Sequence, residues 1–129
     1  MLKSLFRWLL AAFFILAGWN HFRDPQPYLS MMPPYLPWPE LLNQLSGAAE
    51  MAGGLGILIP ALRRLAAWGL IALLIAIFPA NIHIAMNGWQ GMNIASWILW
   101  ARLPFQLLFI AWVYWTCLSQ PAKENPARP

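Results

Sequence analysis

The chain has 129 residues, of which 60% are hydrophobic and only 9% are charged, and its formal net charge is +4. A soluble domain carries about 25% charged residues, so this composition argues against a water-soluble globule and predicts one membrane-embedded domain. The basic residues are scattered at the ends of apolar runs and form no basic face, which argues against nucleic-acid binding. Cys117 is the only cysteine, which excludes an intramolecular disulfide and predicts an inert apolar filler.

Four apolar stretches predict four transmembrane helices, at residues 5–19, 41–59, 65–86 and 98–118. Each is close to the roughly 20 residues that a helix needs to cross the hydrocarbon core. Backbone groups in lipid must be satisfied within the segment, and continuous apolar runs do not fit an alternating β-barrel pattern. The predicted fold is therefore an all-α transmembrane four-helix bundle over residues 1–118, followed by a polar, disordered tail at 119–129.

Lys3 and Arg7 flank the start of the first stretch, a pattern that is also typical of a signal peptide. No convincing small-residue cleavage site follows it, so we favour an uncleaved first helix. Basic residues also lie between the second and third stretches and after the fourth. They are Arg63, Arg64, Lys123 and Arg128. The positive-inside rule then predicts that both termini are cytoplasmic.

The connection between the first and second stretches is rich in proline, with six prolines between positions 25 and 39. Proline fixes φ and disfavours helix in the residue before it, so we expect an extended and stiff external connection. Its Tyr28, Met31, Met32 and Trp38 suit the membrane interface. Two interpretations stay open, which are a loop that only anchors the bundle and a lid over a site.

Polar side chains gather in the outer half of the predicted bundle. Glu50 lies roughly 14 Å into the second stretch and Arg102 roughly 6 Å into the fourth, at about 1.5 Å per residue. An ion in hydrocarbon is costly, so such residues usually face a partner, a cavity or a functional path. We therefore expect Glu50 to pair with Arg102, and the alternative is that Arg102 snorkels outward to the headgroups. The candidate ligand-binding residues are Glu50, Arg102, His21, Asn81, His83 and Gln106.

Prolines and glycines interrupt the predicted helices near these polar residues. Pro79 and Pro104 each leave a backbone carbonyl without its donor, which predicts kinks that open the bundle or simple bending to fit neighbours. Small residues surround Glu50 and predict close helix packing first and room for a ligand second. They are Gly47, Gly53, Gly54 and Gly56.

The two histidines, His21 and His83, end helices on the same predicted side of the membrane. Two histidines can ligate haem or a metal ion. Neither has the spacing of a known metal site, so we expect no metal and interpret both as polar interfacial side chains.

A series of short motifs spans most of the chain. They are Ala17-Gly18 to His21-Phe22, Pro25, Tyr28, Leu36-Pro37, Ser46-Gly47-Ala48-Ala49-Glu50, Gly53-Gly54-Leu55-Gly56, Arg63-Arg64, Phe78-Pro79-Ala80-Asn81-Ile82-His83 and Arg102-Leu103-Pro104-Phe105-Gln106. Over about residues 8–116 this combination resembles the DoxX-like family of small bacterial membrane proteins. The resemblance implies a four-helix protein of the bacterial cytoplasmic (inner) membrane. Founding members are linked to a quinone-reducing thiosulfate oxidation complex, and others to membrane-associated oxidoreductase assemblies.

Three functions are compatible with the sequence. In the first, the chain is a quinone-interacting accessory subunit of a membrane oxidoreductase, with Arg102, His21 or Asn81 as donors to quinone carbonyls and Glu50 as a proton relay. In the second, it is a non-catalytic structural or assembly subunit whose polar network fixes helix packing. The third is a small transporter or lipid-binding protein, although no inverted repeat is visible. No classical catalytic motif is present, and the expected partners are the lipid membrane and an oxidoreductase or a second copy.

Overall fold

The computed structural model describes residues 2–89 and 91–119, which form five α-helices and contain no strand. The helices are α1 (Leu2–Arg23), α2 (Gln26–Met31), α3 (Pro39–Leu58), α4 (Arg63–Asn87) and α5 (Ser96–Val113), and α5 continues into the π-helical turn η1 (Tyr114–Leu118). The all-helical prediction is confirmed. The predicted tail at 119–129 lies, except for Ser119, outside the described residues.

Among the described residues, three helical segments are long and apolar enough to cross a membrane. They are α1, α4 and α5 together with η1. The segment α3 has 20 residues and matches the second predicted span, but it is less apolar because it carries Asn43, Gln44, Ser46 and Glu50. Its passage through a membrane therefore stays a prediction.

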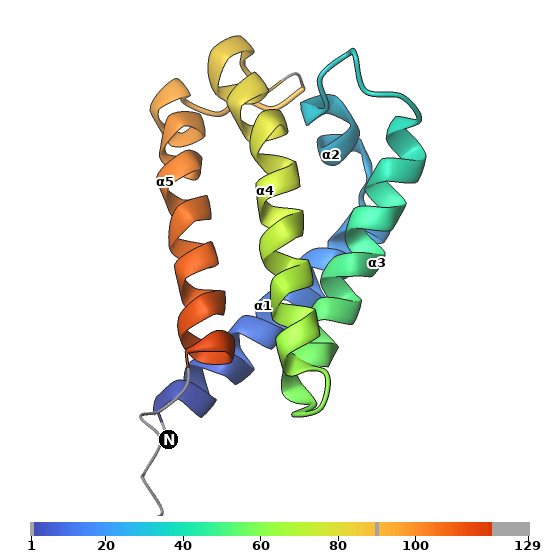
Figure 1. The fold of residues 1–129 in the computed structure, drawn as a ribbon. Coiled ribbons are helices and arrows are strands. Elements are labelled where there is room, and N and C mark those ends of the chain that lie inside the picture. The colour runs from blue at the N-terminus through green and yellow to red at the C-terminus, as the bar shows by residue number, and fades with distance from the viewer. Residues whose placement is uncertain (1, 90, 120–129) are drawn as a thin grey trace, which may run out of the picture.

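The long helices pack with alternating direction along the chain. Figure 1 shows α3, α4 and α5 side by side, with α4 in the middle, while α1 crosses obliquely and packs mainly against α3. The start of α1 lies beside the end of η1. Lys3 Nζ donates to Ser119 Oγ at 2.8 Å, and Arg7 Nη2 donates to the carbonyl of Thr116 at 2.6 Å. These two bonds hold the described ends of the chain together at one end of the bundle.

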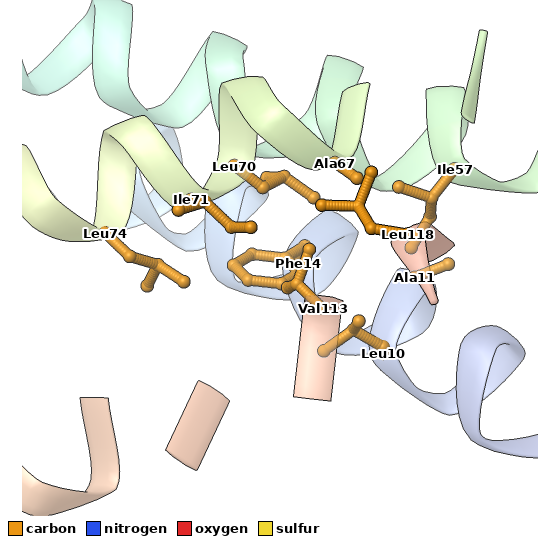
Figure 2. Close-up of a cluster of buried hydrophobic side chains, with 10 residues drawn as sticks. All are labelled: Leu10, Ala11, Phe14, Ile57, Ala67, Leu70, Ile71, Leu74, Val113 and Leu118. Atoms are coloured by element: carbon orange, nitrogen blue, oxygen red, sulfur yellow. The ribbon is translucent and has the colours of Figure 1, made fainter. Parts of the chain in front are cut away.

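An apolar core fills the half of the bundle that holds the chain ends. In Figure 2 the ring of Phe14 on α1 lies between Leu70 and Ile71 of α4 and Val113 of α5. Phe14 and Val113 are almost completely buried, and burial of a large apolar side chain contributes roughly 1.5–3 kcal/mol. The buried cluster consists of Leu10, Ala11, Phe14, Ile57, Ala67, Leu70, Ile71, Leu74, Val113 and Leu118.

Glycines allow α1 and α3 to approach each other closely. A Cβ placed on Gly18 would lie 2.6 Å from the carbonyl oxygen of Gly47 and 2.9 Å from the amide nitrogen of Met51. A Cβ on Gly47 would lie 2.7 Å from the Cβ of His21. Only residues without side chains fit at this contact, as is typical of helix packing in lipid. The predicted packing role of the glycine stretch is therefore confirmed at Gly47.

The proline-rich connection differs from the expected extended form. Its residues 26–31 form the short helix α2, which begins after Pro25 and has Pro27 in its first turn. Proline is tolerated in a first turn because the amide that it lacks would have no partner there, and its fixed φ suits a helix. The expectation of a continuously extended connection is therefore wrong. Beyond α2, Trp38 adopts a left-handed conformation with φ 49° where α3 begins.

Candidate functional site

A cavity of about 390 Å³ lies in the half of the bundle away from the chain ends. Phe14 and Leu74, which belong to the apolar core, form part of its wall. Most of the other lining side chains are apolar or aromatic, and the polar ones come from α1, α3, α4 and α5. The lining residues are Phe13, Phe14, Ala17, His21, Tyr28, Met31, Met32, Ser46, Glu50, Leu74, Ile77, Ala80, Asn81, Arg102, Phe105, Gln106 and Phe109.

One wall of the cavity carries a buried polar cluster between α1 and α3. His21 Nε2 lies 3.3 Å from Glu50 Oε2, and the two side chains are only 8% and 9% exposed. His21 Nδ1 lies 2.7 Å from Asn43 Oδ1, and Asn43 Nδ2 donates to the His21 carbonyl at 3.0 Å. The contact between His21 Nε2 and Glu50 Oε2 is an ion-pair approach, and within the described part of the chain Oε2 has no aligned hydrogen bond. The Glu50 side chain is also one of those that line the cavity.

The expected pair between Glu50 and Arg102 is not formed. Glu50 pairs with His21 because the contact through Gly18 and Gly47 brings α1 against α3. Arg102 belongs to α5, which packs on α4 instead. Both charged side chains still line the same cavity, from different walls.

The second polar wall joins α4 to α5. Asn81 Nδ2 donates to Gln106 Oε1 at 2.5 Å, and Gln106 Nε2 donates to the carbonyl of Leu74, in the turn that precedes Pro79. Arg102 is half-buried, and its Nε and Nη2 each lie 3.4 Å from Asn81 Oδ1. Buried polar groups are stabilised by such bonds, so this wall is a satisfied network with a guanidinium at its edge.

The short helix α2 covers part of the cavity and is held from two sides. The ring of Tyr28 stacks on the ring of His21 with centroids 3.8 Å apart, and Asn20 Nδ2 donates to the Tyr28 hydroxyl at 2.7 Å. On the other side, Trp89 Nε1 donates to the carbonyl of Pro27 at 2.8 Å. The guanidinium of Arg102 lies 5.1 Å from the ring centroid of Trp89, within cation–π range. These contacts favour the lid over the plain anchoring loop.

Five of the six candidate residues are brought together by the fold. His21, Glu50, Asn81, Arg102 and Gln106 all line the cavity. His83 is not among the lining residues, and its ring and carbonyl contact Asn87 instead. Among residues 2–89 and 91–119, no group of three or more His, Cys, Asp or Glu side chains has a metal-binding arrangement.

Sequence reasoning missed Asn43, Trp89 and the role of Tyr28. Asn43 carried a usable signal, because it lies seven residues before Glu50 and therefore on the same face of the helix. A second signal is the glycine spacing: Gly18 lies three residues before His21, and Gly47 lies three residues before Glu50. Trp89 follows the end of α4 in a connection, where helical periodicity gives no guide to its partner.

The arrangement combines three kinds of chemistry in one mainly apolar chamber. The carboxylate and imidazole of Glu50 and His21 can hold or transfer a proton, and the guanidinium of Arg102 has N–H donors beyond those facing Asn81. The aromatic rings of Phe13, Phe105 and other lining residues offer flat surfaces to a ring-bearing ligand. The cavity therefore suits an apolar molecule with hydrogen-bonding oxygens.

Replacing Gln106 with leucine is expected to destabilise the protein markedly. The change leaves Asn81 Nδ2 without its acceptor and removes the side-chain donor to the Leu74 carbonyl, and a buried group left unpaired costs about 1–3 kcal/mol. The measurement is the thermal unfolding midpoint in detergent. Gln44→Leu, the same change at an exposed position of α3, is the matched control. Equal midpoints for the two variants would show that the α4–α5 network contributes nothing.

Comparison with known proteins identifies a family of unassigned role. The family model described as a domain of unknown function, DUF8561, matches residues 10–117. No curated protein and no solved structure shows significant similarity to the chain. The matched segment contains every residue that lines the cavity. The DoxX-like resemblance is not tested by this match and stays a prediction. The chain belongs to the DUF8561 family.

Proposed function

We propose that this chain is a multi-pass protein of the bacterial inner membrane that binds a quinone in the cavity and serves a membrane oxidoreductase as an accessory subunit. The observation that carries the proposal is the composition of the cavity wall. A titratable His21–Glu50 pair lies on the wall formed by α1 and α3, and a half-buried guanidinium, Arg102, comes from α5. Aromatic and aliphatic side chains form most of the remaining surface.

The size and chemistry of the cavity support a quinone head group. Ligand pockets commonly enclose about 300–1,000 Å³ and combine apolar walls with a few placed polar groups. A quinone ring is flat and apolar, and its two carbonyl oxygens need hydrogen-bond donors. Arg102 on α5 and His21 on α1 offer such donors from separate helices. The DoxX-like resemblance independently favours a redox-associated role.

The topology supports a four-span arrangement with both chain ends in the cytoplasm. The described ends are tied together by the Lys3–Ser119 and Arg7–Thr116 contacts. The connection between α3 and α4 lies at the same end of the bundle in Figure 1, and α4 begins there with Arg63 and Arg64. The positive-inside rule places such a basic end in the cytoplasm. In this arrangement α3 spans the membrane in addition to α1, α4 and α5, and the cavity lies in the outer half of the bundle.

Binding of a short-chain quinone tests the proposal directly. The protein is purified with its native lipids, the lipids are extracted and analysed for quinone, and decylubiquinone is then titrated against tryptophan fluorescence. Arg102→Gln removes a charged donor, and a hydrogen bond to a charged group contributes roughly 1.5–3 kcal/mol, so affinity is expected to fall about 10- to 100-fold.

The matched control is Arg64→Gln, which changes an exposed arginine at the opposite end of the bundle and should leave affinity unchanged. The absence of quinone from the extract together with a flat titration would end the proposal. So would equal affinities for the wild-type protein and Arg102→Gln.

A structural or assembly role is the second candidate, and the polar network itself favours it. The Asn43–His21 contacts join α3 to α1, and the Asn81–Gln106 bond joins α4 to α5. Buried polar groups of this kind can fix which helices pair. In that case Glu50→Gln lowers the thermal midpoint without altering any flux, and an enzyme co-purifies with the chain in mild detergent. Isolation as a bare monomer that binds quinone would contradict this candidate.

A further inference from the structure

Both ring nitrogens of His21 are engaged by side chains of α3. Nδ1 lies 2.7 Å from Asn43 Oδ1, and Nε2 lies 3.3 Å from Glu50 Oε2. The ring face is covered by Tyr28, which stacks at 3.8 Å. The imidazole therefore has a fixed orientation, with one edge toward an amide and the other toward a carboxylate.

The orientation of Asn43 determines where His21 carries its proton. Asn43 Nδ2 lies 3.0 Å from the His21 backbone carbonyl, which can only accept a hydrogen bond, so the amide nitrogen belongs at that position. The amide oxygen is then the atom that faces Nδ1. An amide oxygen also only accepts, so His21 Nδ1 must carry a hydrogen.

With Nδ1 protonated, the His21–Glu50 pair holds one further proton, which lies between His21 Nε2 and Glu50 Oε2. If that proton is on Nε2, the pair is an imidazolium beside a carboxylate. If it is on Oε2, the pair is a neutral imidazole beside a carboxylic acid. Both forms have zero net charge, which favours them at a site where the two side chains are only 8% and 9% exposed. Loss or gain of a proton would leave a buried net charge.

We infer that Asn43, His21 and Glu50 form a one-proton relay at the cavity wall, in which Asn43 is a positioning residue. Asn43 keeps Nδ1 protonated, so only the edge of His21 that faces Glu50 can exchange a proton. His21 Nε2 lies 3.3 Å from Glu50 Oε2, and the Glu50 side chain lines the cavity. The inference deepens the proposed function, because it names the ligand group that the relay serves: an oxygen that exchanges a proton with Glu50, as a hydroquinone hydroxyl does. Only this choice of ligand rests on the proposed function.

The chain contains its own reference for this arrangement. His83 is the other histidine, and Asn87 Nδ2 lies 3.0 Å from its carbonyl and 3.3 Å from its Nδ1. Here the amide nitrogen faces the ring, so Nδ1 of His83 is an acceptor and its hydrogen is on Nε2. The two histidines are therefore expected to have their protons on opposite nitrogens.

Nitrogen-15 NMR of the histidine-labelled protein in detergent, without ligand, tests the relay. At about pH 8 an ordinary imidazole is neutral. The expected spectrum shows a protonated Nδ1 for His21 and an unprotonated Nδ1 for His83, and His83→Gln assigns the signals. In Glu50→Gln, His21 should keep its Nδ1 proton and show an unprotonated Nε2. In Asn43→Leu, the Nδ1 proton should be lost in favour of Nε2.

An unprotonated Nδ1 on wild-type His21, or a protonated Nε2 in Glu50→Gln, overturns the relay. The second result is decisive even if Asn43→Leu does not fold. Decylubiquinol is then added, and the His21 Nε2 signal should move while the signals of His83 stay in place. Quinol binding that leaves both His21 nitrogens unmoved also overturns the inference. If the ligand-free spectra are as expected but decylubiquinol does not bind, the proposed function is contradicted and the relay is not.

Discussion

Replacing Gly18 with alanine is expected to separate α1 from α3 and to disrupt the site. The new Cβ would lie 2.6 Å from the Gly47 carbonyl oxygen and 2.9 Å from the Met51 amide nitrogen, and both are backbone atoms of α3 that cannot rotate away. Overpacking of this kind costs about 1–3 kcal/mol. His21 lies one turn after Gly18, so the displacement also moves the imidazole away from Glu50.

The matched control is Gly69→Ala in α4, because a Cβ there meets nothing within 4 Å. Alanine is a better helix former than glycine by roughly 0.5–1 kcal/mol, so this control should be neutral or slightly stabilising. Thermal unfolding in detergent measures both variants, and decylubiquinone titration measures the site. A Gly18→Ala protein as stable as Gly69→Ala would mean that the close contact is not needed.

The long helices were largely predictable because each corresponds to a long run of mainly apolar residues. The predicted third span, residues 65–86, differs from α4 (Arg63–Asn87) by two residues at one end and one at the other. The first helix was predicted too short, at residues 5–19 against Leu2–Arg23, because Lys3 was taken as a flanking residue. Long basic side chains extend to the interface from within a helix, so they do not mark its start.

The short helix α2 was not predictable from proline content alone. Six prolines between positions 25 and 39 suggested an extended connection. The effect of proline depends on its position, since it breaks a helix interior but suits a first turn. Pro27 lies in the first turn of α2, and Pro39 is the first residue of α3.

Membership of the site was predictable, but its pairings were not. Ionisable and amide side chains in an apolar helix usually face the protein interior, and this rule selected His21, Glu50, Asn81 and Arg102 together with His83, which does not line the cavity. Depth along a helix gives one coordinate only. Which helices are neighbours decides the partner, and the glycine contact of α1 with α3 assigns Glu50 to His21. Because α5 packs on α4, Arg102 meets Asn81 instead.

The pair formed by His21 and Glu50 is expected to show strong energetic coupling. Removing one partner of a buried pair leaves the other uncompensated and costs about 3–5 kcal/mol, whereas replacing both with apolar residues of similar volume is often neutral. His21→Leu and Glu50→Leu should therefore each lower the free energy of unfolding strongly. The double variant should recover most of the loss, since both side chains are more than nine-tenths buried.

A double-mutant cycle measured by unfolding in detergent gives the coupling energy. The control cycle uses His83→Leu and Glu40→Leu, because His83 is only half-buried, Glu40 is exposed, and His83 contacts Asn87 rather than a carboxylate. That cycle should be additive within about 0.5 kcal/mol, as expected for independent sites. Additivity at His21 and Glu50 as well would show that the two side chains do not depend on each other. Neither the relay nor a proton-exchanging cavity would then have a physical basis, because both require the imidazole and the carboxylate to hold their proton jointly.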